Sequence, residues 1–139
     1  MHRQLKLFSF LILVTVFVGL FLRNITPKEI GELNGIVRHV VDGDSLFLNS
    51  TKKSIRLWGV DAPEKDEVGY AEATKTLTRL ALKKAVQCVR IDADHYERIV
   101  ARCYLRDDRE INRLMIESGA ASEYLYYTLG YYKWNKAPQ

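Results

Sequence analysis

Five charged residues of this sequence have the types and order that chemistry on a phosphodiester requires: Asp44, Arg56, Asp61, Glu64 and Arg98. Carboxylates bind hard divalent cations, and they can also hold or deprotonate a water molecule. A guanidinium group stays charged and can bind two phosphate oxygens at once, which stabilises negative charge as it develops in a reaction. We therefore expect an enzyme that hydrolyses phosphodiester bonds at a metal ion.

The elements that must position these residues are short strands and helices. Apolar runs predict five strands, at 35–41, 45–49, 54–60, 86–91 and 99–105. Apolar residues at three- and four-residue spacing predict helices over 69–85 and 109–118, with Gly119 in a left-handed cap. This order favours a mainly β fold with helices (α+β), namely a five-stranded OB-fold barrel capped by helices.

The two aspartates are the candidate metal ligands. Asp44 follows the first turn and Asp61 ends the third strand, so a meander of the first three strands brings both to one end of the barrel. Two carboxylates, a backbone carbonyl and water suit an open, oxygen-liganded Ca²⁺ site. Taken alone, Asp42-Gly43-Asp44 is more often an ordinary turn.

The other three charged residues are candidates for acting on water and phosphate. Glu64 lies three residues after Asp61 and is placed to hold or deprotonate a water, although alone it is more typical of a helix entry. Arg56 and Arg98 are candidates for the phosphate, although each alone is more often a solvated surface residue. Arg56 precedes Asp61 by five residues, and in an ideal strand this odd spacing directs the two side chains to opposite faces. A bulge at Gly59 would bring them to the same face.

Tyrosines are the candidate substrate-binding groups, because nucleobases stack on aromatic rings. Tyr96 lies two residues before Arg98, and Tyr124 and Tyr126 belong to the tyrosine-rich stretch 124–132. We expect single-stranded DNA or RNA to contact these rings. The alternative for the stretch 124–132 is that it packs onto the barrel.

The first 28 residues form a separate segment. Residues 7–22 carry no charge, and as a helix they would span about 24 Å, against about 30 Å for the bilayer core. We expect an uncleaved membrane anchor with the domain outside the cytosol. The alternatives are a cleaved signal, which gives a secreted protein, and a mitochondrial membrane.

Charge is unevenly divided along the chain. Of the 21 Lys and Arg residues four lie in 1–28, so the remaining 17 balance the 17 Asp and Glu residues of 29–139. A neutral domain argues against broad, non-specific adhesion to nucleic acid, but it allows a local basic cleft.

Cys88 and Cys103 are the two cysteines of the chain. Outside the cytosol they could form a disulfide. Strand alternation, however, places Cys103 in the core and Cys88 on the solvent face with Arg90, so we expect two free thiols. No Cys and His spacing predicts a zinc site.

Three blocks of the sequence resemble the staphylococcal nuclease-like (thermonuclease) family in order and spacing. They are Asp-Gly-Asp-Ser at 42–45, Ile-Arg-Leu-Trp-Gly-Val-Asp-Ala-Pro-Glu at 55–64 and Tyr-Glu-Arg-Ile-Val-Ala at 96–101. Segment 111–121 looks like the helix that follows in this family, and the resemblance covers about residues 34–134. It implies an OB-fold barrel and Ca²⁺-dependent cleavage of DNA and RNA. The implied site has Asp44, Asp61 and the Ala62 backbone carbonyl on the metal, Glu64 on water, and Arg56 and Arg98 on the phosphate.

The chain departs from the family pattern in places. Ser45 replaces the usual threonine, and Glu97 replaces a common glycine, which would add negative charge beside Arg98. The chain stops at Gln139, so we expect a domain over 29–139 with a truncated last helix and a face for a partner or the membrane to cover. The alternative function is a non-catalytic OB-fold module that binds nucleic acid or protein at a membrane. We favour a monomeric nuclease, because binding alone does not require all five charged residues.

Overall fold

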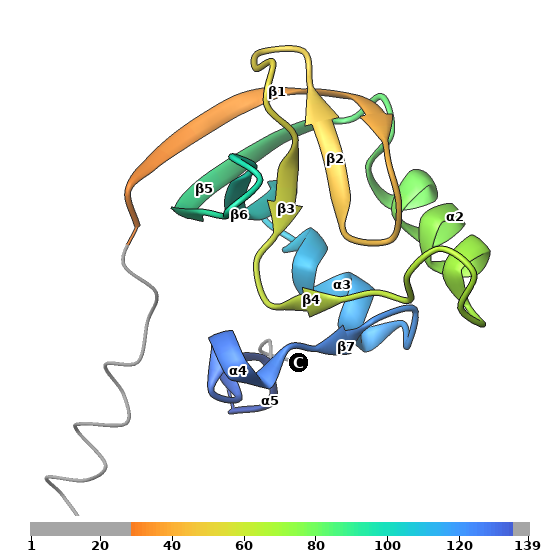
Figure 1. Ribbon diagram of the computed structural model, residues 1–139. Coiled ribbons are helices and arrows are strands. Elements are labelled where there is room, and N and C mark those ends of the chain that lie inside the picture. The colour runs from red at the N-terminus through yellow and green to blue at the C-terminus, as the bar shows by residue number, and fades with distance from the viewer. Residues whose placement is uncertain (1–28, 135–139) are drawn as a thin grey trace, which may run out of the picture.

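The computed structural model describes residues 29–134, and the predicted N-terminal anchor lies outside them. Five strands close into a barrel in the order β1-β2-β3-β6-β5 (Figure 1). Their bounds are β1 Gly31–Val40, β2 Ser45–Leu48, β3 Ile55–Leu57, β5 Ala85–Ala93 and β6 Ile99–Leu105. Neighbouring strands are antiparallel except β3 and β6, which run parallel. The predicted five-stranded barrel is therefore confirmed.

The remaining elements lie beside and below the barrel. Figure 1 shows α2 (Tyr70–Ala81) next to β1 and β2, and α3 (Ile111–Glu117) under the barrel. A two-stranded sheet pairs β4 (Val60–Asp61) with β7 (Ser122–Glu123). Two short helices follow, α4 (Leu125–Thr128) and α5 (Tyr131–Trp134). Within residues 29–134, no helix has the length and hydrophobicity needed to cross a bilayer.

The core forms because alternate residues of the strands point inward and meet one face of each long helix. In β6, every second residue from Ile99 to Leu105 is buried, and Leu77 of α2 and Met115 of α3 are fully buried against the barrel. Removing these apolar side chains from water is the main driving force for the fold.

Asn112 ties α3 to the barrel through a fully buried amide. Its Oδ1 accepts from the Cys103 backbone N–H at 2.9 Å. Its Nδ2 donates to the backbone carbonyls of Trp58 at 2.9 Å and of Ala101 at 3.1 Å. The side chain thereby gives the Cys103 N–H an acceptor and adds a second donor to each carbonyl, since Ala101 also accepts from the Trp58 N–H and Trp58 from the Tyr132 hydroxyl.

Several predicted boundaries differ from the structure because long-range pairing sets them. β1 begins at Gly31, four residues before the predicted strand, because residues 31–36 pair with β5 and close the barrel. α2 ends at Ala81 instead of residue 85, since Lys83 turns the chain at a positive φ of 62° and Ala85 already begins β5. β7 was not predicted, and α4 and α5 lie in the last part of the chain, for which only one truncated helix was expected.

The prediction of two free thiols is wrong. Cys88 and Cys103 lie opposite each other on β5 and β6, are fully buried, and form a disulfide inside the barrel. Arg90 explains the difference, because a charged side chain suggests a solvent-facing position on β5 that the structure does not have. Arg90 pairs with the buried Ala101, and its Nε is buried although the side chain is partly exposed. A long side chain can begin in the core and still reach water, so it is a poor marker of the outer face.

Candidate active site

The buried carboxylate of Asp44 is the centre of the site. It lies in the turn between β1 and β2, and its Oδ2 is 3.0 Å from Nη2 of Arg56 on β3. Its Oδ1 accepts a hydrogen bond from the Ser45 hydroxyl at 2.9 Å. Burial raises the pKa of Asp44 to about 6; the Arg56 charge opposes this rise and the nearby Asp42 adds to it. The negative charge of Asp44 is therefore only partly compensated by its neighbours.

Gly43 allows this turn to approach the segment that carries the second predicted metal ligand. A Cβ added at Gly43 would lie 2.6 Å from the Cβ atoms of both Ala62 and Ala73. The Ala62 backbone nitrogen is 3.4 Å from Oδ2 of Asp44. The structure thus places Asp44 directly beside the Asp61–Ala62 segment, with α2 behind them.

Arg56 and Asp61 belong to different strands, which removes the difficulty of their spacing. β3 ends at Leu57, and the chain turns at Gly59 with a φ of +71° before β4 begins. A Cβ at Gly59 would lie 2.4 Å from Cγ2 of Thr128, so this turn also packs against α4. A turn therefore takes the place of the predicted bulge, and Asp61 is solvent-exposed on β4.

Arg98 joins the same network through Ser45. Its Nη1 donates to Oγ of Ser45 at 3.4 Å, and its Nε donates to Oδ2 of Asp94 at 2.6 Å. Partial burial raises the pKa of Asp94, but hydrogen bonds and charge from Arg98 outweigh this and hold it below its usual value. Ser45 thus links Asp44, and with it Arg56, to Arg98. Ser45 was not predicted as a site residue, and only its place beside Asp44 pointed to it.

An aromatic groove of about 400 Å³ runs along this pair of arginines. Arg56, Arg98, Tyr96 and Tyr124 all line it, as the sequence suggested. The Arg98 guanidinium lies over the Tyr96 ring, 5.4 Å from its centroid. Two guanidiniums beside aromatic rings form a surface suited to a phosphate and its nucleobases.

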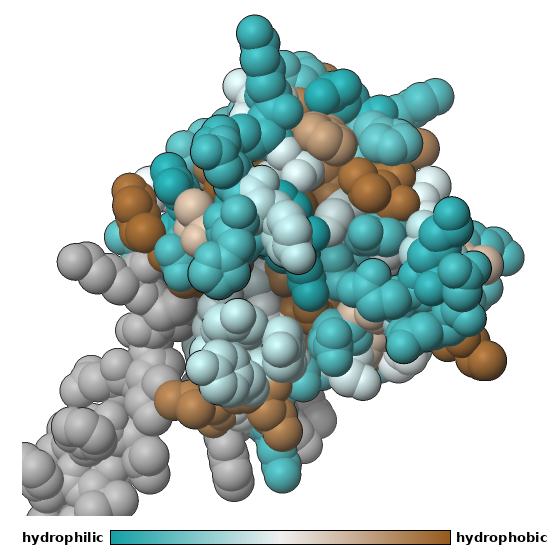
Figure 2. Space-filling model, in the orientation of Figure 1, coloured by the Kyte–Doolittle hydropathy of each residue, from teal (hydrophilic) through white to brown (hydrophobic). Residues whose placement is uncertain are grey.

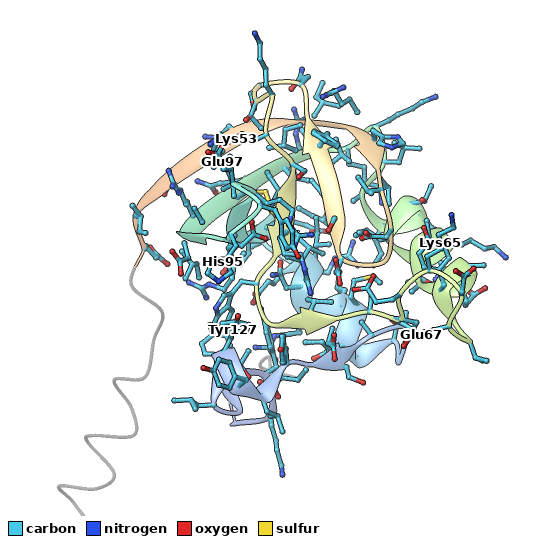
Figure 3. The ribbon with its side chains drawn as sticks, viewed as in Figure 1. Lys53, Lys65, Glu67, His95, Glu97 and Tyr127 are labelled. Atoms are coloured by element: carbon cyan, nitrogen blue, oxygen red, sulfur yellow. A yellow bond between two sulfur atoms is a disulfide. The ribbon has the colours of Figure 1, made fainter. Side chains whose placement is uncertain are left out.

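Two further groove residues were missed by the sequence analysis, and one predicted residue lies outside. His95 and Tyr127 also line the groove, and Figure 3 shows them on the same flank of the molecule. Tyr126 does not line it and is 78% exposed. Tyr127 lies in the tyrosine-rich stretch, but nothing local in the sequence distinguishes its side of α4 from that of Tyr126.

The same stretch also packs onto the barrel, as the alternative interpretation proposed. The Trp58 ring meets the rings of Tyr131 at 5.3 Å and Tyr132 at 5.8 Å between centroids. The hydroxyl of Tyr132 donates to Oε1 of Glu110 at 2.7 Å, and burial raises the pKa of Glu110. The tyrosines are therefore divided between the groove and the packing of the last segment.

Glu64 lies on the exposed loop between β4 and α2. Its backbone N–H donates to Oε2 of Glu67 at 2.8 Å, and Figure 3 shows Lys65 and Glu67 of this loop on the flank opposite His95. Within residues 29–134, no hydrogen bond or ion pair joins the Glu64 carboxylate to Asp44 or to either arginine. The structure brings Asp44, Arg56 and Arg98 together, and Glu64 lies on the loop that follows Asp61 and Ala62.

Glu97 does not place its charge against Arg98, contrary to the expectation. Its Oε2 forms an ion pair with Nζ of Lys53 at 3.3 Å, and the two side chains lie together in Figure 3. The residue has a positive φ of 59°, which turns the chain between β5 and β6. The carboxylate is thereby directed to the loop between β2 and β3.

The donor atoms at this end of the barrel suit a hard cation. In the described part of the chain, no three His, Cys, Asp or Glu side chains are grouped closely enough to hold a metal by themselves. Asp44, Asp61 and the Ala62 carbonyl offer oxygen atoms only, which is the ligand type that Ca²⁺ takes. The partly compensated charge of buried Asp44 fits a cation there, with water completing the shell.

An OB-type barrel with a buried acid and two linked arginines beside an aromatic groove defines a protein that binds phosphodiesters. The chain belongs to the family of staphylococcal nuclease homologues, whose model matches residues 54–136. The predicted resemblance is thus confirmed, and the protein is a nuclease, a hydrolase.

Similar proteins agree with this family. The chain is 32% identical to an uncharacterized endonuclease of Escherichia coli over 103 residues, which are 73% of this chain and 67% of that protein. It is also 32% identical to an uncharacterized endonuclease of Haemophilus influenzae over 130 residues, 91% of this chain and 68% of the other. It is 27% identical to a micrococcal nuclease of Shigella flexneri over 106 residues, 69% of this chain and 61% of the other.

Proposed function

We propose that this nuclease hydrolyses phosphodiester bonds of DNA or RNA with Ca²⁺ as cofactor, and that it acts outside the cytosol. The observation that carries the proposal is the network that joins Arg56, Asp44, Ser45 and Arg98, in which the two arginines line the groove and the acid and the serine lie buried behind them. It fixes two guanidiniums beside a buried carboxylate, which is the arrangement that a scissile phosphate and a cation together need.

Arg56 and Arg98 hold the phosphate. Arg56 is oriented by its contacts with the carboxylate of Asp44 and with the Leu57 carbonyl, at 3.0 Å each. Arg98 is oriented by Asp94 and Ser45. These contacts leave most N–H donors of each guanidinium available for phosphate oxygens. Because the side chains are held in place before substrate arrives, little reorganisation opposes the stabilisation of the transition state.

Asp44, Asp61 and the Ala62 carbonyl would hold the cation. When bound, Ca²⁺ supplies Lewis-acid polarisation of a phosphate oxygen. Glu64 holds or deprotonates the attacking water from the exposed loop that follows Asp61 and Ala62.

The groove tyrosines select the form of the nucleic acid. Tyr96, Tyr124 and Tyr127 line the same groove as the two arginines, whereas Tyr126 does not line it. Bases of a single strand are free to stack on such rings, whereas bases of a duplex are already stacked on one another. We therefore propose single-stranded DNA or RNA as the preferred substrate of a monomeric enzyme.

The Cys88–Cys103 disulfide supports a site of action outside the cytosol. Disulfides persist in oxidising compartments and are reduced in the cytosol of most organisms. The uncharged stretch 7–22 supports anchoring of the protein to a membrane, with the domain on the oxidising side.

The test is cleavage of a quenched fluorescent single-stranded DNA by the full chain in detergent, first with millimolar Ca²⁺ and then with EDTA. We expect cleavage only with Ca²⁺. Arg56→Ala and Arg98→Ala should each lower the rate by about 10²-fold or more, as the loss of a fixed donor to the transition state does. Glu64→Gln should lower it as well.

Arg109→Ala is the matched control. Arg109 pairs with Asp107 at 2.9 Å, much as Arg98 pairs with Asp94, but it lies outside the groove. Its substitution should leave the rate unchanged. No cleavage by a folded, Ca²⁺-saturated chain would refute the proposed reaction, and equal rates for the Arg98 and Arg109 variants would refute the proposed site.

A further inference from the structure

Three apolar side chains on the outer side of α4 have no use in the groove. Leu125, Tyr126 and Leu129, named here the α4 patch, are 58%, 78% and 67% exposed. Figure 2 shows hydrophobic atoms gathered at the foot of the molecule, where Figure 1 places α4. Tyr124 and Tyr127 point into the groove, whereas none of the three patch residues lines it. The short helix therefore has a substrate side and a second apolar side.

Leu129 holds its place in the patch at a conformational cost. It ends α4 in the left-handed region, with a φ of 50°. Glycine and asparagine adopt this conformation readily, and bulky residues rarely do. Its N–H closes the helix by donating to the Leu125 carbonyl at 2.9 Å, but its side chain is 67% exposed, so an apolar partner would explain a leucine at this position.

The start of the domain is fastened to the same corner of the molecule. Oε1 of Glu29 is 2.7 Å from Nη2 of Arg102, and Nη1 of Arg102 donates to the Tyr131 hydroxyl at 2.6 Å. Tyr131 begins α5, two residues after Leu129. The chain therefore enters the barrel where Arg102 connects it to the start of α5, the helix that follows α4.

The length of the intervening chain limits how far this corner can lie from the uncharged stretch 7–22. Only residues 23–28 separate that stretch from Glu29, and six residues extend over at most about 22 Å. If 7–22 is embedded in a bilayer, as the proposed anchor requires, the α4 patch is within reach of the lipid surface.

We infer that the α4 patch docks into the interface of the bilayer that holds the N-terminal segment. Tyrosine and leucine side chains suit this depth, since tyrosine prefers the headgroup level and leucine the hydrocarbon below it. Residues 124–134 contain no Asp or Glu, so no carboxylate of this segment opposes contact with anionic headgroups. Docking holds the groove beside the membrane. The inference rests on the membrane anchor of the proposed function, but not on the nuclease chemistry.

The test places a nitroxide label at single positions of the full chain in liposomes of phosphatidylcholine and phosphatidylglycerol. The label is attached at Leu125→Cys in the patch and at Val68→Cys as the control, an apolar residue that is 101% exposed on the loop before α2. The native cysteines are paired and fully buried, so only the introduced thiol reacts. Collision rates with oxygen, which enriches in lipid, and with a water-soluble nickel chelate report the depth of each label.

We expect the label at position 125 to gain oxygen access and lose nickel access by several-fold on reconstitution, while the label at 68 stays aqueous. Adding Leu129→Asn, which keeps a residue suited to the left-handed conformation, should return the label at 125 toward water. Nuclease rates in detergent and flotation of the liposomes are measured on the same samples.

The outcomes separate the proposals. A chain that floats but keeps position 125 aqueous overturns docking and leaves the anchor in place. A chain that does not float overturns both. If the label at position 125 becomes inaccessible to both oxygen and the nickel chelate, a second copy or another protein covers the patch. This result also overturns docking. An inactive chain that docks overturns the nuclease mechanism alone.

Discussion

Gly43→Ala isolates the packing that sets the position of Asp44. The new methyl carbon would lie 2.6 Å from the Cβ of Ala62 and from the Cβ of Ala73, whereas carbon atoms in contact are separated by about 3.5–4.0 Å. Each overlap is therefore about 1 Å. Neither neighbour can rotate away, because an alanine Cβ moves only with its backbone. The turn, the Asp61–Ala62 segment or α2 must shift.

The size of the effect follows from this overlap. Forcing an extra methyl group into a packed site costs about 1–3 kcal/mol, and in a domain of this size each kcal/mol lowers the melting temperature by about 4–8 °C. The site is more sensitive than the fold, because a displacement of about 1 Å in a catalytic group can lower a rate by about 10²-fold. We expect Gly43→Ala to melt about 10 °C lower and to lose most of its activity at temperatures where it is still folded.

The assay is a thermal melt and the Ca²⁺-dependent cleavage rate of the full chain. Gly31→Ala is the matched control, because a Cβ there meets no atom within 4 Å and alanine is slightly preferred over glycine in a strand. Its melting temperature and rate should equal or slightly exceed those of the wild type. Equal behaviour of Gly43→Ala and Gly31→Ala in both measurements would contradict tight packing of Gly43 against Ala62 and Ala73.

Three other predictions test the rest of the fold and site. The double substitution Cys88→Ala with Cys103→Ala removes a cross-link between residues 15 positions apart. It should lower the free energy of unfolding in urea by about 3 kcal/mol. Two reactive thiols in the denatured wild type would contradict the disulfide itself. Asn112→Leu leaves the buried N–H of Cys103 without its acceptor and should cost about 1–3 kcal/mol in urea unfolding; an unchanged midpoint would contradict this role. Partial burial raises the pKa of Asp94, but Arg98 outweighs this and lowers the pKa in the folded state. The Asp94–Arg98 pair therefore contributes its full stability above the unfolded pKa near 3.8. This contribution is lost as the pH falls through the lower folded pKa. Urea unfolding should therefore separate Asp94→Asn from the wild type at pH 7 and bring them together in strong acid, and an equal difference at both pH values would count against this ion pair.

The barrel and its chemistry were accessible from the sequence because both depend on local patterns. Alternation of apolar residues in β2 and β6 is a direct consequence of strand geometry, so these strands were predicted within a residue or two. Asp44, Arg56 and Arg98 lie in short sequence blocks whose residue types allow few other interpretations. The protein family that these blocks indicate could therefore be predicted, and it was confirmed.

Features decided by contacts between distant segments were missed. The start of β1 depends on its pairing with β5, and the Cys88–Cys103 disulfide depends on the register of β5 with β6. Periodicity within one strand carries no information on register with another. Arg90 misled the assignment of faces because its side chain is long enough to leave the core.

What the sequence by itself determined is the set of reactive groups and the class of fold, since residue type and local period define them. Only the tertiary structure decided which groups meet. The Ser45 hydroxyl joins Asp44 to Arg98, a residue 53 positions away in the chain, and the turn at Gly59 separates Arg56 from Asp61. Tyr127 enters the groove while Tyr126 does not. The physical reason is that closing the barrel fixes the distance between strand ends far apart in the sequence, and a local pattern contains no measure of that distance.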